Sequence, residues 1–209
     1  MSRGCFITFE GGEGTGKSTQ IALLVKKLKT TGLQVVETRE PGGSKGAEKI
    51  RQLLVTGNPQ SWSPLAEALL ISAARDDHLR RVIAPAIEDG KFVVCDRYID
   101  STSAYQGVGG SVNRELLKAL ETHVVGTYIP DLTLIFDLDP KIGLDRAKAR
   151  AQGSEDRFEA KGLAYHQKIR QAFIDIAQKY PERCVIVDAS HGVNDIEERV
   201  WQIISDRFL

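Results

Sequence analysis

A glycine-rich run near the start of the chain has the spacing of a phosphate-binding loop. Residues 11–18 read GGEGTGKS and match G-x-x-x-x-G-K-[ST] at every position. Glycines let the backbone turn its N–H groups toward a phosphate, and a following helix adds its positive N-terminal end. We expect Lys17 to reach the β- and γ-phosphates of ATP and the Ser18 hydroxyl to hold Mg²⁺. The residues expected to bind the nucleotide are Gly11, Gly12, Glu13, Gly14, Thr15, Gly16, Lys17, Ser18 and Thr19.

An apolar run that ends in a carboxylate supplies a second expected metal ligand. Residues 92–95 lead directly into Asp96, the arrangement in which a strand-end carboxylate holds Mg²⁺, here through water. Two other apolar runs end similarly at Asp137 and Asp188, where an aspartate often only caps a turn. We prefer Asp96 because Arg97 follows it, and a cation there could reach a phosphate at the carboxyl ends of the strands.

The elements that must position these residues are short apolar runs separated by helical patterns. Near-continuous apolar strands alternating with helices predict an α/β fold, with a parallel sheet covered by helices on both faces. The five expected strands are residues 6–9, 34–38, 92–95, 132–136 and 185–187.

Two helices can be placed from their apolar faces. One face repeats at helical spacing from Ile21 to Leu28, and Gly32 stands where a C-terminal cap is expected. Near the end of the chain, Asn194 and Glu197 have the spacing of a capping box ahead of another apolar face.

Composition narrows the kinds of partner. The 209 residues carry 28 Lys and Arg against 28 Asp and Glu, so a net charge of zero gives no bulk attraction to nucleic acid or anionic membrane. No apolar run approaches about 18 residues, so we expect no membrane span. The three cysteines lie among β-forming residues, and no signal-peptide core precedes Glu10, which together predict a cytoplasmic protein. With no linker or repeat, residues 1–209 are expected to form one domain.

A phosphate-binding loop alone does not separate a molecular switch from a kinase. Guanine-reading switches usually carry N-K-x-D, and no Asn-Lys pair occurs in this chain. A D-x-x-G turn that would sense the γ-phosphate is also missing. These absences favour a small-molecule phosphotransferase, which needs a second anion site and a means of excluding water.

Clustered basic residues agree with phosphoryl transfer. Residues 152–156 form a polar interruption between two helical segments and are interpreted as a flap that closes over the site. Two polyanions repel each other in a dry site, and placed cations offset that repulsion. The basic residues are Arg39, Arg51, Arg75 and Arg97 near expected loops or strand ends, and Arg146, Lys148, Arg150 and Arg157 around the flap.

Several of these segments together resemble the thymidylate kinase family over essentially the full length of the chain. They are residues 9–19 (FEGGEGTGKST), 38–43 (TREPGG), 73–75 (AAR), 96–98 (DRY), 103–107 (SAYQG), 146–150 (RAKAR) and 156–159 (DRFE). The resemblance implies a three-layer P-loop nucleoside-monophosphate-kinase fold with a five-stranded parallel sheet. It also implies phosphorylation of dTMP to dTDP with ATP and Mg²⁺.

The resemblance implies a role for each residue of the acceptor site. Arg51 and Arg97 look like the pair that grips the dTMP phosphate. Arg75 and Gln106 look like the groups that hydrogen-bond thymine, with Thr102 close by.

Further acceptor roles follow from the same resemblance. Tyr105 lies where the family blocks a ribose 2′-OH, Glu13 lies near the sugar 3′-OH, and Glu40 belongs to the loop that anchors acceptor and metal. Ile71 stands where the family commonly has a phenylalanine that stacks on thymine.

On the donor side, the resemblance implies a basic lid over residues 146–158. Arg146 looks like the residue that stacks on adenine, and Arg150 and Arg157 look like cations that reach the phosphates. The catalytic residues are then Lys17, Arg97, Arg150 and Arg157. The P-loop itself holds no arginine, as in the bacterial-like type of the family.

Two alternatives stay open at this point. A deoxynucleoside kinase on the same fold would need a carboxylate base, and Glu10 or Glu40 could be imagined in that role. A nucleotide-hydrolysing switch would need no acceptor. The family is typically homodimeric, and the apolar stretch Leu65–Ile71 could supply an interface.

Overall fold

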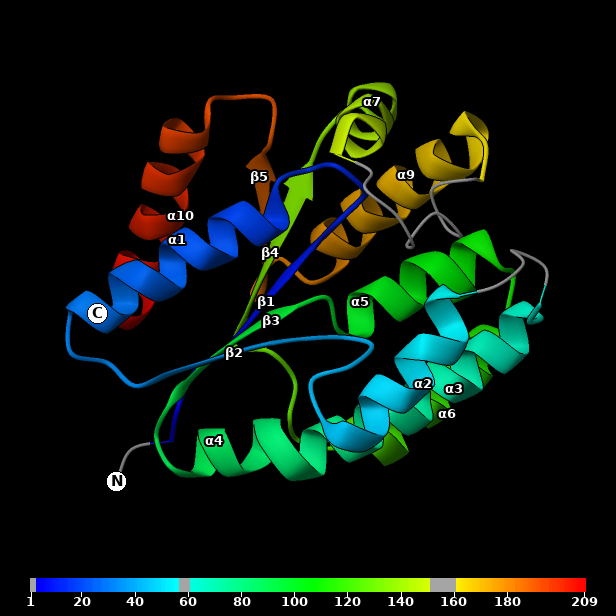
Figure 1. The fold of residues 1–209 in the computed structure, drawn as a ribbon, viewed down its shortest axis with the longest axis horizontal. Coiled ribbons are helices and arrows are strands. Elements are labelled where there is room, and N and C mark those ends of the chain that lie inside the picture. The colour runs from blue at the N-terminus through cyan, green and yellow to red at the C-terminus, as the bar shows by residue number, and fades with distance from the viewer. Residues whose placement is uncertain (1–2, 57–60, 151–160) are drawn as a thin grey trace.

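The computed structural model describes residues 3–56, 61–150 and 161–209, without the side chain of Arg150. Their centre is a parallel sheet with strand order β2-β3-β1-β4-β5 (Figure 1). The strands are β1 Phe6–Gly11, β2 Val35–Arg39, β3 Phe92–Asp96, β4 Leu132–Asp137 and β5 Cys184–Asp188. The predicted α/β class and all five strands are confirmed, with ends within one or two residues.

Helices α1 (Lys17–Thr30) and α10 (Val193–Phe208) cover one face of the sheet (Figure 1). The buried side of α1, including Leu24 and Leu28, packs with Val200 of α10 on the apolar strands. Gly32 has a φ of 84° just after α1, as expected for a glycine that ends a helix.

The predicted capping box of Asn194 and Glu197 is wrong. Helix α10 begins at Val193, with Gly192 as its N-cap and no side-chain cap. Asn194 therefore lies inside the first turn, where its side chain cannot cap the helix it belongs to.

The remaining helices of the described residues lie on the other face of the sheet or pack around the helices there. These are α2 Lys45–Val55, α3 Pro64–His78, α4 Ala84–Glu88, α5 Ile99–Thr102, α6 Arg114–Val125, α7 Pro140–Arg150 and α9 Leu163–Lys179. π-Helical segments join α3 to α4 (Leu79–Ile83) and continue α5 (Ser103–Gly109). Two buried clusters hold this layer to the sheet, one around Tyr98 and one around Phe173. The result is the three-layer arrangement predicted from the sequence.

Among the described residues, no helix combines the length and apolar composition needed to cross a bilayer. All three cysteines are free thiols: Cys95 and Cys184 are buried in strands and Cys5 is partly covered.

Candidate active site

The P-loop joins β1 to α1 at the carboxyl end of the sheet. Gly16 is the N-cap of α1 with a φ of 89°, and Gly14 has a φ of 66°. A Cβ at Gly14 would lie 1.9 Å from the carbonyl oxygen of Gly143, so only glycine can pass there. Close backbone approach and left-handed conformations explain why this loop needs its glycines.

Lys17 is folded back onto its own loop. Its Nζ donates to the carbonyl oxygens of Gly11 (3.1 Å) and Gly12 (2.8 Å), and the side chain is buried. Burial and the nearby charge of Arg97 lower the pKa of Lys17 to about 8, against the opposing pull of Asp96. The ammonium is thus held by carbonyl groups of its own loop, at the wall of a cavity.

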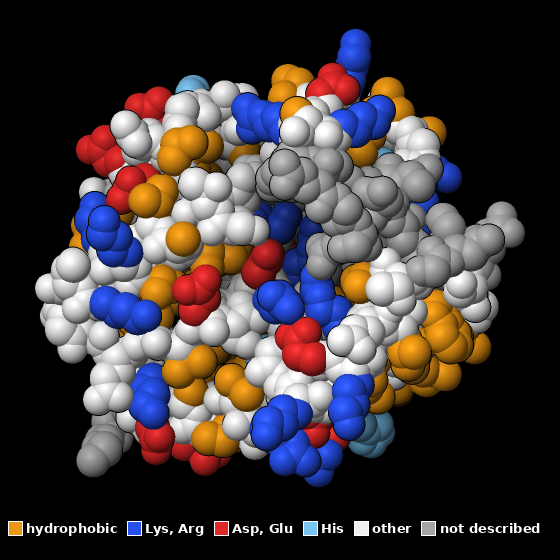
Figure 2. Space-filling model, viewed as in Figure 1, with side chains coloured by type: hydrophobic (Ala, Val, Ile, Leu, Met, Phe, Trp, Pro, Cys, Tyr) orange, Lys and Arg blue, Asp and Glu red, His pale blue; other side chains and the backbone are white. Residues whose placement is uncertain are grey.

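A cavity of about 470 Å³ opens from this loop. It lies at the carboxyl ends of the strands, where open parallel sheets place their ligands. Figure 2 shows the hollow near the centre of one face, with basic and acidic side chains at its wall. The predicted site residues that line it are Glu13, Gly14, Thr15, Gly16, Lys17, Ser18, Glu40, Arg51, Ile71, Arg75, Asp96, Arg97, Thr102, Tyr105 and Gln106.

Arg97 lines this cavity beside the P-loop. It follows β3 with a φ of 64°, unusual for a residue with a side chain. Its Nη1 donates to the Gly11 carbonyl at 2.9 Å, and its Nη2 donates to Glu13 Oε1 at 2.8 Å. Its guanidinium also lies over the ring of Tyr105, 5.1 Å from the centroid. The arginine expected to bind the acceptor phosphate is therefore fixed in place by the donor loop.

Glu13 receives a second donor from the same region. The Tyr105 hydroxyl donates to Glu13 Oε1 at 2.9 Å. Burial alone would raise the pKa of Glu13, but Arg97, Lys17 and the Tyr105 hydroxyl outweigh it and lower the pKa to about 2. Glu13 is thus an anion that accepts hydrogen bonds from both Arg97 and Tyr105.

Glu10, a buried carboxylate of β1, helps to hold the conformation of Arg97 through hydrogen bonds to the residues that follow it. Glu10 Oε1 accepts from the backbone N–H groups of Tyr98 (2.7 Å) and Ser101 (3.1 Å), and its Oε2 accepts from the Ser101 hydroxyl at 2.6 Å. Arg97 Nη1 in turn donates to that hydroxyl at 3.2 Å. Glu10 is absent from the cavity lining, so it is not placed as a base for an acceptor hydroxyl.

A buried cluster of hydrogen-bonded charged and polar side chains forms the part of the cavity wall around Glu40 and Arg75. Arg75 Nε donates to Glu40 Oε2 at 2.7 Å, and His78 Nδ1 lies 3.0 Å from Glu40 Oε1. Arg75 Nη2 donates to the Tyr98 carbonyl and the Thr102 hydroxyl, each at 3.0 Å. Both oxygens of Glu40 are therefore occupied, which argues against a role as a base.

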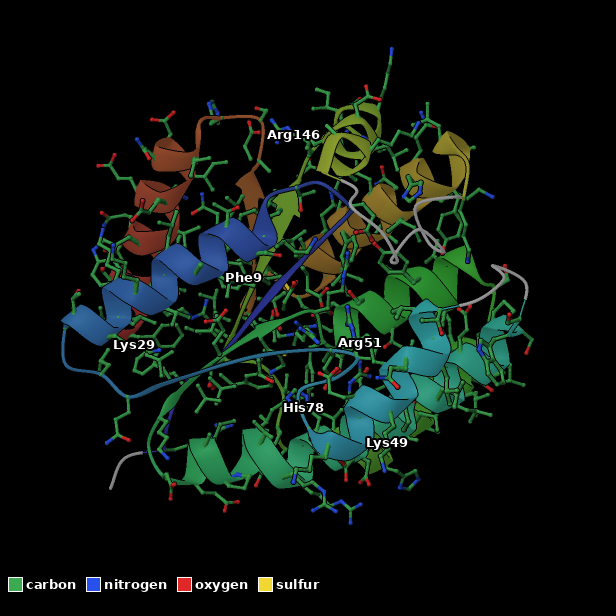
Figure 3. All side chains as sticks on the ribbon, in the orientation of Figure 1. Phe9, Lys29, Lys49, Arg51, His78 and Arg146 are labelled. Atoms are coloured by element: carbon green, nitrogen blue, oxygen red, sulfur yellow. The ribbon has the colours of Figure 1, made fainter. Side chains whose placement is uncertain are left out.

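The remaining predicted residues fall in three places. Arg51, which lines the cavity, donates from α2 to the Pro41 carbonyl at 2.8 Å. Arg146 donates to the Ala189 carbonyl at 3.3 Å and does not line the cavity (Figure 3). Gly11, Gly12 and Thr19 belong to the loop and first helical turn but do not line the cavity. Arg157 and the side chain of Arg150 lie outside the described residues.

Two of the residues expected at the metal, Ser18 and Asp96, line the same cavity. Asp96 Oδ1 is buried and has no hydrogen-bond partner in the described part of the chain. Within those residues there is no cluster of three or more His, Cys, Asp or Glu that could hold a metal. A hard cation that keeps waters and uses nucleotide phosphates suits this sparse donor set.

The sequence interpretation missed the buried groups that hold the site residues. Glu67 accepts a hydrogen bond from Gln106, His78 bridges Glu40 and Thr38, and Ser101 links Glu10 to Arg97. An acidic residue inside an apolar strand, such as Glu10, was a usable signal; the others depend on how distant segments meet.

Comparison with known proteins agrees with the geometry. A family model described as thymidylate kinase matches residues 9–200. A thymidylate kinase from Caulobacter vibrioides is 51% identical over 207 residues, covering 99% of each chain, and one from Nitrobacter hamburgensis is 51% identical over 210 residues, covering 100% of this chain and 91% of the relative.

A solved structure agrees as well. The crystal structure of thymidylate kinase from Ehrlichia chaffeensis superposes with a TM-score of 0.80 at 33% identity, covering 97% of this chain and 99% of that one. The P-loop kinase fold predicted from the sequence is thereby confirmed. With a matching family model over most of the chain and full-length relatives at half identity, this chain belongs to the thymidylate kinase family.

Proposed function

We propose that this chain is an ATP-dependent phosphotransferase that converts dTMP to dTDP. The observation that carries the proposal is one cavity whose wall holds both the P-loop lysine and an arginine tied to that loop, Lys17 and Arg97. Family membership supplies the acceptor, because the relatives are named thymidylate kinases.

The proposed chemistry needs positioning and charge neutralisation rather than a general base. The second pKa of a phosphate monoester is about 6, so the acceptor is largely a dianion at neutral pH with a nucleophilic oxygen. Lys17 and the loop amides hold the donor phosphates, and Arg97 with Arg51 holds the acceptor phosphate. Arg150 and Arg157 cover the transferring group in this proposal, and Arg146 contacts adenine.

Further side chains orient the acceptor. In this proposal Glu13 lies near the sugar 3′-OH, and Tyr105 closes the space that a 2′-OH would need. Arg75, Gln106, Thr102 and Ile71 surround the base, with Glu40 behind Arg75.

Mg²⁺ is the proposed metal, with Ser18 as a direct ligand and Asp96 acting through water. When bound, it would supply positive charge that offsets the negative charge of the donor phosphates. The unpartnered buried Oδ1 of Asp96 supports this choice.

The arrangement of the chain completes the proposal. We place residues 1–209 in one domain, with 146–158 as the lid and a cytoplasmic location that suits three free cysteines. Exposed leucines on neighbouring helices support a homodimer: Leu53 on α2, Leu65 and Leu69 on α3, and Leu116 on α6. Figure 2 shows hydrophobic side chains gathered over α2 and the start of α3. Light scattering on a size-exclusion column should give twice the mass of one chain.

The decisive experiment follows ADP release with ATP and Mg²⁺ across dTMP, dUMP, dCMP, dGMP, dAMP, UMP and thymidine. Strong stimulation by dTMP is expected. Preference for thymidine over dTMP would indicate a deoxynucleoside kinase. Slow ATP hydrolysis that no acceptor stimulates would indicate a nucleotide-hydrolysing switch.

A further inference from the structure

Glu67 is a buried carboxylate that the proposed mechanism does not use. It lies in the first turn of α3, and only 4% of its surface is exposed. Its Oε2 accepts from Nε2 of Gln106 at 3.0 Å. Gln106 itself is 2% exposed and lines the cavity. The carboxylate therefore contacts a residue of the cavity wall without lining the cavity itself.

This contact decides which way the Gln106 carboxamide points. An ionised carboxylate can only accept hydrogen bonds, so it must face the NH₂ end of the amide and not the oxygen. Gln106 Oε1 then lies on the other side, and among the described residues it has no hydrogen-bond partner, yet it is not a fully buried atom. An acceptor is thus presented to the cavity.

Arg75 presents a hydrogen-bond donor to the same cavity. Its Nε and Nη2 are used by Glu40, the Tyr98 carbonyl and Thr102. Its Nη1 makes no hydrogen bond to any residue that the structure describes, and Arg75 lines the cavity. The wall therefore offers one fixed donor, from Arg75, and one fixed acceptor, from Gln106.

A donor beside an acceptor matches one class of pyrimidine edge. Thymine and uracil offer O4 as an acceptor next to N3–H as a donor, which is complementary to this wall. Cytosine offers its 4-amino group as a donor next to N3 as an acceptor, so both contacts become like-to-like. A rotated Gln106 amide would remove half of that conflict.

We propose that Glu67 is a positioning residue for base specificity: by holding the Gln106 amide in one orientation, it makes the site reject cytosine nucleotides. This inference rests on the proposed function, since it takes the cavity wall at Arg75 and Gln106 as the base site. Glu67 touches no substrate in this arrangement and acts on the base through its hydrogen bond with Gln106.

The test is Glu67→Gln, which keeps the shape but allows either end of the new amide to face Gln106. Steady-state kcat/KM is measured for dTMP, dUMP and dCMP with saturating ATP and Mg²⁺. The ratio of kcat/KM for dTMP to that for dCMP should fall about tenfold. In the Glu67→Gln variant the Gln106 amide can rotate, so its oxygen no longer has to face N3 of cytosine in a buried contact between two acceptors. The dTMP-to-dUMP ratio should stay unchanged, because both bases present the same edge.

A matched control separates this effect from a general one. Glu115→Gln makes the same chemical change in the first turn of α6, at an exposed position. It should leave all three substrates unchanged. If Glu67→Gln fails to fold by circular dichroism, Glu67→Ala replaces it, and it should lower the dTMP-to-dCMP ratio because it also removes the acceptor behind Gln106.

The outcomes are distinguishable. Equal loss of kcat/KM on dTMP, dUMP and dCMP would make Glu67 merely structural, and an unchanged dTMP-to-dCMP ratio would overturn the role assigned to it. Both results leave the proposed function standing, because the unsubstituted chain still phosphorylates dTMP. If that chain does not use dTMP, the proposed function fails first and the role of Glu67 fails with it.

Discussion

Arg97 Nη2 lies 2.8 Å from Glu13 Oε1, so the residue expected to grip the acceptor phosphate is paired with a carboxylate of the nucleotide-binding loop. The Tyr105 hydroxyl donates to the same Glu13 oxygen. About four-fifths of each charged side chain is covered, with 18% of Arg97 and 21% of Glu13 exposed. A charged ligand that draws Arg97 toward itself must therefore disturb the loop that is expected to hold the donor.

Glu13→Gln should reduce the free energy of unfolding at neutral pH by about 1–3 kcal/mol, because the Arg97 charge loses its partner. The pKa of Glu13 is lowered to about 2 in the folded protein, against about 4.3 when unfolded. Stability from the ionised form is then complete above about pH 5 and is lost as the pH falls toward 2. Urea titrations at pH 7, 5, 4 and 3 should show the difference between variants shrinking by roughly half at pH 3.

The control for Glu13 is Glu121→Gln, which breaks a surface pair of similar length, 2.7 Å from Lys118. That change should cost less than about 1 kcal/mol, because Lys118 is solvated. An equal loss in the two variants, or a Glu13→Gln loss that persists undiminished at pH 3, would contradict the pairing argument.

The sequence was sufficient for the parts of the fold that depend on local pattern. Each apolar run became a parallel strand because a doubly covered sheet demands apolar side chains on both faces. The P-loop was predicted in full because its glycines are required by backbone geometry alone, as at Gly14 and Gly16. Residues predicted from the resemblance largely line one cavity.

The contacts that hold the site residues could not be predicted from the sequence. Glu10 meets Ser101 across 91 residues of chain, and Glu40 meets Arg75 across 35. The first pair forms because β3, which leads toward Ser101, lies beside β1 in the sheet, and the second joins the residue after β2 to helix α3. The capping-box prediction failed for a smaller reason: a pattern places a helix start only to within a residue or two, and capping depends on the exact position.

The Glu10→Gln variant should gain stability relative to the unsubstituted protein, measured as the free energy of unfolding, as the pH rises from 5 to 8. Burial, and then the neighbouring charge of Asp100, raise the pKa of Glu10 to about 7. Since the unfolded carboxyl loses its proton near pH 4.3, the folded protein is penalised progressively between about pH 4.3 and 7. Glutamine keeps an acceptor for the backbone N–H groups of Tyr98 and Ser101 but has no charge to bury.

The measurement for Glu10 is the difference in unfolding free energy between the two proteins at pH 5, 6, 7 and 8. It should shift by about 1–3 kcal/mol in favour of glutamine across that range. A difference that stays flat with pH would mean that Glu10 is ionised throughout, and the raised pKa would be wrong.

Arg157→Ala should lower kcat by roughly 10²–10³ while raising KM for dTMP or ATP much less. The proposed lid contact is strongest in the transition state, and losing one such donor has an effect of that size. Arg157 lies outside the described residues, so this expectation rests on the resemblance of the segment around it. Exposed Arg199→Ala, on α10, is the control and should keep normal rates. A change confined to KM would remove Arg157 from the transition state.

Lys17→Met should abolish turnover and yet stabilise the protein at pH 7. Burial, then the charge of Arg97, lowers the pKa of Lys17 to about 8, whereas an unfolded lysine titrates near 10.4. The folded protein therefore binds this proton less readily, so at pH 7 the ionised side chain costs stability, and that cost disappears as the pH rises from about 8 to 10. A methionine of similar length has no charge to desolvate and should raise the free energy of unfolding by about 1–3 kcal/mol at pH 7, with the gain fading above pH 9.

Lys26→Met, at an exposed position of the same helix, should change stability by less than about 0.5 kcal/mol and leave turnover intact. Urea titration with the ADP-release assay measures both effects. Lower stability in Lys17→Met would show that the bonds from Nζ to the Gly11 and Gly12 carbonyls outweigh the cost of burial. Measurable turnover would remove Lys17 from the donor phosphates.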